Sequence, residues 1–257
     1  MSNRTPVDGY KLVILDCPYD TWENPETQAM FGRMVGLKLR GFRPYYDYGA
    51  LPVDTTDYVG RHKLICRDVN GSLVPVAGYK AVDLSRCGIH RVPFPALAKA
   101  KASGAIMHAR VIEEILNTAI NRGEELTYEA ALTMDPALHS SREFADTIKM
   151  MIPAIQYWQN RDYRIPSSMC TAVIKVKADQ FLSTIGFRPI QIEGGIELEP
   201  FGALHLGGEA VRPMLLKEFT PGAEAIAERL RFFWNSRLTI ADDSGVRELM
   251  RAYKKAA

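Results

Sequence analysis

Short apolar runs and amphipathic stretches alternate along this chain of 257 residues, and this alternation limits its fold more than any other feature. Helical spacing of apolar residues marks several long stretches, and the runs between them have the length and composition of strands. Strands that alternate with crossover helices build a sheet with helices packed on its faces. The sequence therefore predicts an α/β (α+β) fold, with a mixed central sheet flanked by helices.

The expected elements follow from these patterns. Strands are predicted at residues 11–15, 63–66, 74–82, 126–134, 168–174, 187–192 and 214–219. Helices are predicted at residues 25–41, 107–120, 141–158 and 177–185, and two more are predicted after residue 220.

Local signals set several boundaries. Asn24 is the expected N-cap of the first helix, and Asn70-Gly71 predicts a tight hairpin turn. Pro75 indicates an edge or a bulge in the strand that follows. Ser140 to Glu143 fits a capping box, and Pro153 predicts a kink or a split in the helix after it.

Composition excludes several classes of protein. Hydrophobic residues are 47% of the chain and the formal net charge is +2, which excludes a largely disordered chain and gives no reason to expect a nucleic-acid partner. The sequence has no apolar run of membrane-spanning length and no signal-peptide pattern at its start, so we expect a cytoplasmic protein.

The four cysteines are widely spaced, which is typical of reduced thiols and not of a disulfide frame or a zinc site. Cys87 and His90 form a single C-x-x-H pair without a second half. We therefore expect no metal site from the sequence.

Two stretches of the central and C-terminal parts resemble the GCN5-related N-acyltransferases. Residues 132–136 (LTMDP) are similar to the end of that family's fourth strand, and residues 178–187 (ADQFLSTIGF) are similar to its A-x-x-F-Y-x-x-x-G-F segment. In the N-terminal half, residues 39–42, 54–58 and 62–65 resemble the autoinducer synthase and long-chain N-acyl amino acid synthase branch. The resemblance covers roughly residues 10–192.

The resemblance implies an N-acyltransferase that moves an acyl group from acyl-CoA or an acyl-carrier protein to the amine of a small molecule. It implies no permanently bound cofactor. The backbone at Thr133 and Met134 would hold the oxyanion and the pantetheine arm. The family's glycine-rich pyrophosphate loop is missing from residues 139–144, so Ser140, Ser141 and Arg142 are the groups left to bind phosphate.

Acyl transfer to an amine needs a base and a way to orient the acceptor. Glu129 is the candidate base, and the alternative is an ion-paired strand glutamate. His139 is a second candidate acid or base, or an incidental histidine. Asp57 and Asp54 would orient the amine, although aspartates are also common in turns.

The helix end at residues 40–42 supplies the remaining acceptor candidates. Arg40 would pair with the two aspartates and brace the acceptor loop. Phe42, in the same Arg-x-Phe segment of this sequence, would contact the acceptor.

The expected organisation is an acyltransferase core at residues 1–219 and a C-terminal helical extension at residues 220–257. The extension would either cover the sheet or form the face of a homodimer. Its basic and aromatic segment, residues 229–237, fits a nucleic acid or an acidic carrier protein less well than it fits an amphipathic helix. The alternative for the whole chain is a non-catalytic binding or regulatory protein that has lost the donor site.

Overall fold

One mixed sheet of nine strands runs through the part of the chain that this computed structural model describes, residues 7, 9–46, 53–138, 141–192 and 194–241. The strands are β1 (Tyr10–Asp16), β2 (Arg61–Val69), β3 (Ser72–Asp83), β4 (Leu126–Met134), β5 (Ser167–Val173), β6 (Arg188–Pro189), β7 (Phe201–Ala203), β8 (Glu209–Leu216) and β9 (Leu238–Ile240). Their spatial order is β6-β8-β5-β4-β3-β2-β1-β9, with β7 also paired to β8. The pairs β4–β5 and β1–β9 are parallel, and the others are antiparallel.

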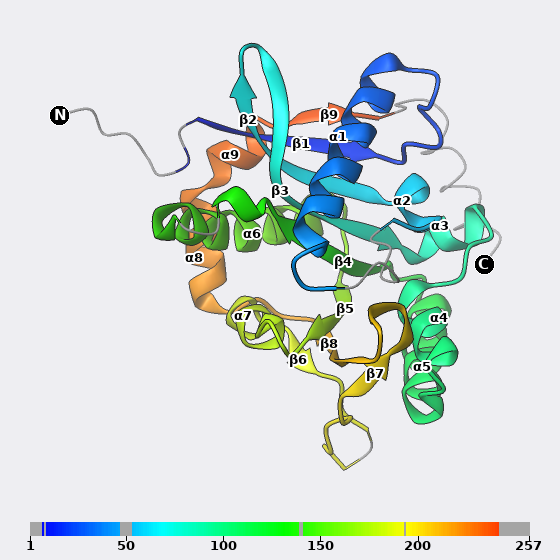
Figure 1. The fold of residues 1–257 in the computed structure, drawn as a ribbon. Coiled ribbons are helices and arrows are strands. Elements are labelled where there is room, and N and C mark those ends of the chain that lie inside the picture. Colours follow the sequence, from blue (N-terminus) through cyan, green and yellow to red (C-terminus); the bar gives the residue numbers. More distant parts are fainter. Residues whose placement is uncertain (1–6, 8, 47–52, 139–140, 193, 242–257) are drawn as a thin grey trace.

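Helices cover both faces of this sheet (Figure 1). They are α1 (Pro25–Phe42), α2 (Thr56–Val59), α3 (Leu84–Ile89), α4 (Pro95–Ala102), α5 (Ile106–Arg122), α6 (Arg142–Asp162), α7 (Ala178–Ile185), α8 (Pro221–Arg229) and α9 (Arg231–Asn235), with short 3₁₀ turns at Pro136–Leu138 and Leu204–Leu206. None of the helices in the described ranges has the length and the apolar composition needed to cross a membrane.

Alternation along the strands decides which helices pack where. On β1, Leu12 and Ile14 belong to the cluster that includes residues of α6, whereas Val13 and Leu15 pack with α1. Successive side chains of a strand point to opposite faces, so the four apolar residues serve both layers. Helices α1, α4 and α5 thus share one face, and α6, α7 and α8 cover the other. The predicted fold class is confirmed.

Several local predictions are confirmed. The Asn24 side chain caps α1 by accepting a hydrogen bond from the Glu26 backbone N–H at 2.9 Å. Asn70 and Gly71 form the turn of the β2–β3 hairpin, both with positive φ. Beside Pro75 the register shifts by one residue, which is the predicted bulge.

Two other local predictions concern α6. The helix continues through Pro153 with buried residues on both sides of the proline, so the predicted split does not form, and the kink that was its alternative stays a prediction. Its N-cap is Ser141, whose hydroxyl accepts a hydrogen bond from the Phe144 backbone N–H at 3.2 Å. Ser140, the predicted cap, lies outside the described residues.

The segment after residue 219 contains more than helices. Helix α8 packs on α6, and the Trp158 indole N–H donates to the Ala227 carbonyl at 2.8 Å. Strand β9 then adds to the sheet beside β1, with Leu238 opposite Val13. Residues 221–240 are therefore built onto the same sheet, and the boundary at residue 219 stays a prediction.

Helix α1 approaches β4 very closely at one glycine. A Cβ at Gly41 would lie 2.2 Å from Thr133 Cγ2 and 3.1 Å from the Met134 carbonyl oxygen. The helix can reach the end of β4 only because residue 41 has no side chain.

We predict that Gly41→Ala destabilises the fold by about 1–3 kcal/mol, because the new methyl group overpacks this contact. Thr133→Ser removes the clashing methyl group, so the double variant should recover part of the loss. Gly32→Ala, in the same helix with nothing within 4 Å of the added Cβ, is the control and should be neutral or slightly stabilising. Urea unfolding measures all four proteins. Equal effects of Gly41→Ala and Gly32→Ala would contradict the prediction.

Candidate active site

Strands β4 and β5 part in the middle of the sheet. They pair in parallel only from Leu126 opposite Ser167 to Glu129 opposite Cys170. Beyond this point, Ala130, Thr133 and Met134 of β4 stay paired with β3, and residues 130–134 have no pairing with β5. One edge of β4 is therefore left without a neighbouring strand.

A bulge in β4 begins where the strands part. Lys80 of β3 lies opposite Ala130, but Gly78 lies opposite Thr133, so β4 has one extra residue in this stretch. Ala131 has a φ of 55°, a conformation that non-glycine residues rarely adopt. Such a bulge bends the strand and redirects its side chains.

A cavity of about 380 Å³ fills the gap between the two strands. Residues 130–134 of β4 and 170–173 of β5 line it. On the side of α4 and the 3₁₀ turn at residues 204–206, its lining is polar and includes Asp54, Lys80, Lys99, Tyr128 and His205. On the side of α6 and α7 its lining is mainly apolar and includes Ile148, Ile152, Phe181, Leu182 and Phe187, with Glu129, Lys149, Gln156 and Lys177 as the polar groups there. The cavity therefore joins the two faces of the sheet.

Glu129 lies in the wall of this cavity, 6% exposed. Its Oε2 accepts from Lys63 Nζ at 2.6 Å, and its Oε1 accepts from Gln156 Nε2 at 3.0 Å and Gln159 Nε2 at 2.8 Å. A carboxylate has about four acceptor positions, so three donors leave room for one more, such as a water molecule. Glu129 thus lies at the cavity and also makes the ion pair of the alternative interpretation, and its role as a base stays a prediction.

Lys63 is fully buried beneath Glu129, with its Nζ 4.0 Å from the centre of the Tyr79 ring. Burial lowers the pKa of Lys63 from 10.5 to about 8, and the neighbouring Glu129 carboxylate opposes that shift. Lys63 therefore loses its proton more readily than an exposed lysine.

His205 is a neutral imidazole on the polar side of the cavity. Burial lowers its pKa from 6.5 to about 4, and the positive charge of Lys99 adds to this effect. Lys99 Nζ also donates to the Tyr128 hydroxyl at 3.3 Å, and that hydroxyl lies 2.5 Å from Thr171 Oγ1. Tyr128 and Thr171 thus join β4 to β5 at the start of the gap.

Asp57 lies behind the polar side, fully buried and outside the cavity lining. Its carboxylate pairs with Lys38 and, at 2.9 Å, with Lys80. The Asp54 backbone N–H donates to it at 2.8 Å, and His62 Nε2 donates to its carbonyl at 2.7 Å. With these partners, Asp57 fixes the groups around it and does not reach the cavity.

Asp54 does reach the cavity. Its side chain is 50% exposed, and its Oδ1 accepts from Lys80 Nζ at 2.9 Å and from Thr56 Oγ1 at 2.5 Å. Burial alone would raise the pKa of Asp54. The nearby positive charges, of which Lys80 has the strongest effect, hold this pKa below its usual range. Asp54 is therefore an anionic group at the polar mouth.

The expected pairing of Arg40 is wrong. Arg40 Nη2 pairs with Asp135 Oδ2 at 2.8 Å, not with Asp54 or Asp57. The cause is the direction of the helix: its last turn comes down on the end of β4, where Asp135 follows Met134. Phe42, the last residue of α1, does line the cavity.

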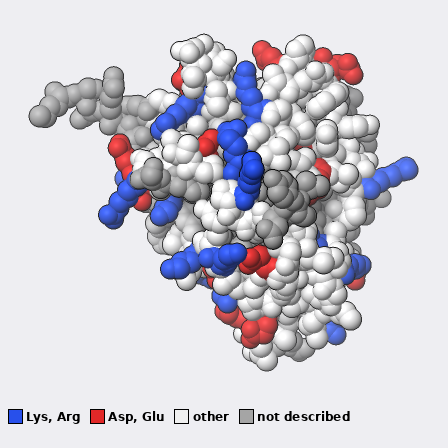
Figure 2. Space-filling model, in the orientation of Figure 1, with Lys and Arg blue, Asp and Glu red and all other residues white. Residues whose placement is uncertain are grey.

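The predicted phosphate-binding groups lie near the N-terminus of α6, and none of those described lines the cavity. Ser141 caps the helix, and Arg142 is 96% exposed with its Nε 3.8 Å from Asp146 Oδ2. His139 and Ser140 lie outside the described residues. Lys149 and Lys177 line the cavity instead. Figure 2 shows Lys and Arg side chains gathered near the middle of the molecular face that it draws.

Sequence reasoning missed Lys63, Lys99, Gln156, Gln159 and His205. A signal existed for two of them: Gln156 and Gln159 are polar residues on the otherwise apolar face of α6, where a buried partner is needed. Lys63 is likewise a charged residue at the start of the apolar run 63–66, within β2. Lys99 and His205 reach the site only through the packing of distant segments, so no local pattern marks them.

Comparison with known proteins bears on the fold. No protein-family model matches the sequence, and no curated protein matches it either. The solved structure of BjaI, a CoA-dependent acyl-homoserine lactone synthase, with SAM and isopentyl-CoA, matches with a TM-score of 0.51 at 10% identity over 95% of this chain and 99% of that one.

Two further structures match less closely. FeeM, an N-acyl amino acid synthase from uncultured soil microbes, has a TM-score of 0.42 at 14% identity over 87% of this chain and 97% of that one. The AHL synthase LasI has a TM-score of 0.43 at 13% identity over 91% and 98%. The BjaI match shows that this chain shares the fold of that protein, the GCN5-related N-acyltransferase fold. The predicted resemblance is thus confirmed for the fold.

The buried His62 makes a prediction for acid stability. Burial lowers its pKa from 6.5 to about 3, and the neighbouring Lys38 contributes to the shift. Since the unfolded chain takes up a proton near pH 6.5 and the folded chain does not, this group's contribution to stability falls as the pH falls from 6.5 towards 3. Between pH 6.5 and pH 4 the loss should be on the order of 3 kcal/mol.

The measurement is the free energy of unfolding in urea at several pH values, for the wild type and for His62→Gln. Glutamine keeps a donor for the Asp57 carbonyl but does not titrate. Between pH 6.5 and pH 4 the variant should therefore lose about 3 kcal/mol less unfolding free energy than the wild type. Identical pH slopes for the two proteins would show that His62 is not held neutral.

Proposed function

We propose that this protein is an N-acyltransferase that moves an acyl group from a thioester donor, acyl-CoA or an acyl-carrier protein, to the amine of a small molecule. The observation that carries the proposal is the cavity that passes between β4 and β5 from one face of the sheet to the other. A reaction between two substrates that approach from opposite faces needs a passage of this kind.

The free edge of β4 is suited to the donor's arm. Residues 130–134 have β3 on one edge and the cavity on the other. Backbone N–H and C=O groups without a strand partner can pair with the amide groups of an extended pantetheine, as a peptide pairs with the edge of a sheet. We assign this role to the backbone at Thr133 and Met134, which would also hold the oxyanion.

The two halves of the cavity suit the two ends of the reaction. The apolar half between α6 and α7 would take the acyl chain, because it offers mainly hydrocarbon contacts. The polar half, with Phe42 and the anionic Asp54, would take the acceptor. A protonated amine is attracted by a carboxylate and must lose its proton before it attacks.

Glu129 is our candidate base. Lys63 and the two glutamine amides hold the carboxylate in place, and a water in its remaining position would pass the amine proton to it. The amine nitrogen would then bond to the thioester carbon, the C–S bond would break, and the thiolate would leave and be protonated. His205, neutral and on the polar side, is the second candidate base. His139 remains a candidate from the sequence, and Asp57 is assigned to positioning.

The phosphate groups of the donor have no glycine cradle here, so local cations must hold them. Lys149 and Lys177 at the cavity wall are candidates, together with Ser140, Ser141 and Arg142 near the start of α6. BjaI was solved with isopentyl-CoA, which makes acyl-CoA the donor to test first.

Binding of donors separates the catalytic proposal from the non-catalytic alternative. Acyl-CoA of several chain lengths and acylated carrier protein should each be added to the full chain in a thermal unfolding experiment. A donor present at about 100 times its Kd should raise the Tm by several degrees, because it binds only the folded state. No shift with any donor would contradict the proposal and favour a binding protein that has lost the donor site.

The role of Glu129 is tested by Glu129→Gln in an assay for free thiol release with a panel of amines. We expect kcat to fall by about 10²–10⁴-fold with a much smaller change in KM, since the amide cannot accept the proton. The exposed Glu124→Gln, just before β4, is the matched control and should keep full activity. His205→Gln is run beside them, and a large fall in that variant alone would move the base to His205.

A further inference from the structure

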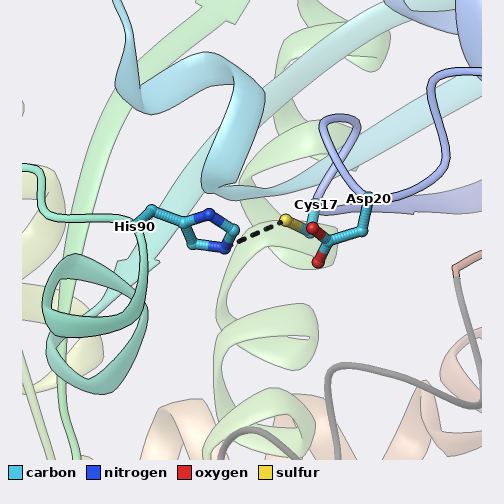
Figure 3. A group of neighbouring side chains, drawn as sticks. All are labelled: Cys17, Asp20 and His90. Atoms are coloured by element: carbon cyan, nitrogen blue, oxygen red, sulfur yellow. Dashed lines mark hydrogen bonds between the residues drawn. The ribbon is translucent and has the colours of Figure 1, made fainter.

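Cys17, Asp20 and His90 converge at the end of the sheet where β1 leaves it (Figure 3). One ligand atom from each side chain lies within 4.8 Å of the other two. Cys17 and His90 are 73 residues apart, with Cys17 Sγ 3.7 Å from His90 Nε2. The three residues take no part in the proposed transferase site, since none of them lines the cavity.

Backbone bonds hold the first two residues side by side. The Cys17 N–H donates to the Gly60 carbonyl at 3.1 Å, and the Asp20 N–H donates back to the Cys17 carbonyl at 3.0 Å. Cys17 has a φ of 47°, a conformation that costs roughly 1–2 kcal/mol in a residue other than glycine. The strained turn thus places the thiol and the carboxylate on the same side.

His90 is fixed from the other direction. It is the C-cap of α3, and its backbone N–H donates to the Arg86 carbonyl at 2.9 Å. The Tyr19 ring packs edge-on against its imidazole, with 5.7 Å between ring centres. Figure 3 shows the imidazole pointing toward Cys17 and Asp20.

The geometry and the unmet hydrogen-bonding needs point to a metal. Sulfur and nitrogen ligands of a tetrahedral zinc ion are about 3.6 Å apart, given bond lengths of about 2.3 and 2.1 Å, and the distance here is 3.7 Å. Asp20 Oδ2 is buried and has no hydrogen-bond partner among the described residues. A buried carboxylate oxygen without a partner is costly unless something binds it.

We propose that Cys17, Asp20 and His90 form a binding site for Zn²⁺, with a fourth position open to water. Thiolate and imidazole ligands favour zinc over magnesium or calcium. Asp20 and His90 are both partly exposed, so the ion has a way in. On binding, the Cys17 thiol gives its proton to solvent and its sulfur bonds to the metal. The bound ion would tie the end of β1 to the end of α3.

The electrostatics favour His90 as a ligand and make Cys17 the costlier one, because a metal binds the thiolate and must displace its proton. Burial lowers the pKa of His90, which keeps the imidazole neutral and able to bind a metal. Burial raises the pKa of the Cys17 thiol to about 12, and the Arg86 guanidinium nearby opposes that shift. A thiol in this state is a poor nucleophile, but a bound cation removes its proton. A reactive thiolate–imidazolium pair is therefore a worse explanation of the cluster.

The test uses the full chain, stripped of metal with a chelator and titrated with Co²⁺ under reducing conditions. We expect one equivalent of Co²⁺ and a near-ultraviolet absorption band from thiolate-to-cobalt charge transfer. With Zn²⁺ at about 100 times its Kd, the Tm should rise by about 5–10 °C. Absence of the band with stoichiometric metal would overturn the proposal.

Variants assign the ligands. Cys17→Ser should abolish the charge-transfer band, whereas Cys87→Ser, the matched control, should keep it. Asp20→Asn and His90→Ala should each weaken Co²⁺ binding at least about tenfold. Even the loss of a residue that only hydrogen-bonds to a metal ligand lowers metal affinity by about that factor. Asp20→Asn changes no side-chain volume, so it tests the site even if Cys17→Ser folds poorly. A band that survives in Cys17→Ser, or is lost in Cys87→Ser, would place the metal elsewhere.

Discussion

The parallel pairing of β4 with β5 lasts four residues and then stops, and the rest of the site depends on this limit. The bulge at Ala131 bends β4 away, and the close contact of Gly41 with Thr133 holds its bent end against α1. An unpaired strand edge inside a protein normally needs another partner for its backbone groups. Here a cavity lies along that edge, so the same interruption of the sheet that creates the space also provides the backbone groups to bind an extended ligand.

Buried ion pairs are the second feature on which the site depends. Lys63 with Glu129, Lys38 and Lys80 with Asp57, and Arg61 and Arg86 with Asp83 all lie on or beside the central strands. Buried ion pairs give up hydration and add little net stability, but removing one partner leaves a costly unpaired charge. Their effect is to fix β2, β3 and α1 relative to each other. The two sides of the cavity differ in composition. Asp54, Lys80, Lys99 and His205 line one side, whereas the other combines apolar side chains of α6 and α7 with Glu129, Lys149 and Lys177.

Much of the fold was predictable because it rests on local periodicity. The strand at 126–134 has the predicted bounds, and the Asn70-Gly71 hairpin and the Asn24 cap form as expected. The errors have physical causes. The apolar spacing of residues 25–41 does not show that Lys38 is buried and Leu39 is 49% exposed, because the buried partner of Lys38 is Asp57, 19 residues away. Helix α6 passes through Pro153 because its packing on both sides outweighs one missing hydrogen bond. The short strand β9 was missed because its pairing with β1 is set by tertiary contact.

The sequence by itself determined the alternation of strands and helices, the fold class, and the place of Glu129 within the strand 126–134, since each depends on side chains near one another in the chain. Only the tertiary structure decided which charges meet. Arg40 pairs with Asp135, Glu129 receives Lys63 and two glutamines from α6, and His90 faces Cys17 across 73 residues of sequence. The physical reason is that backbone propensity and apolar periodicity act over a few residues. The partners of a buried polar group are chosen by how the sheet and its helices pack, which no local pattern encodes.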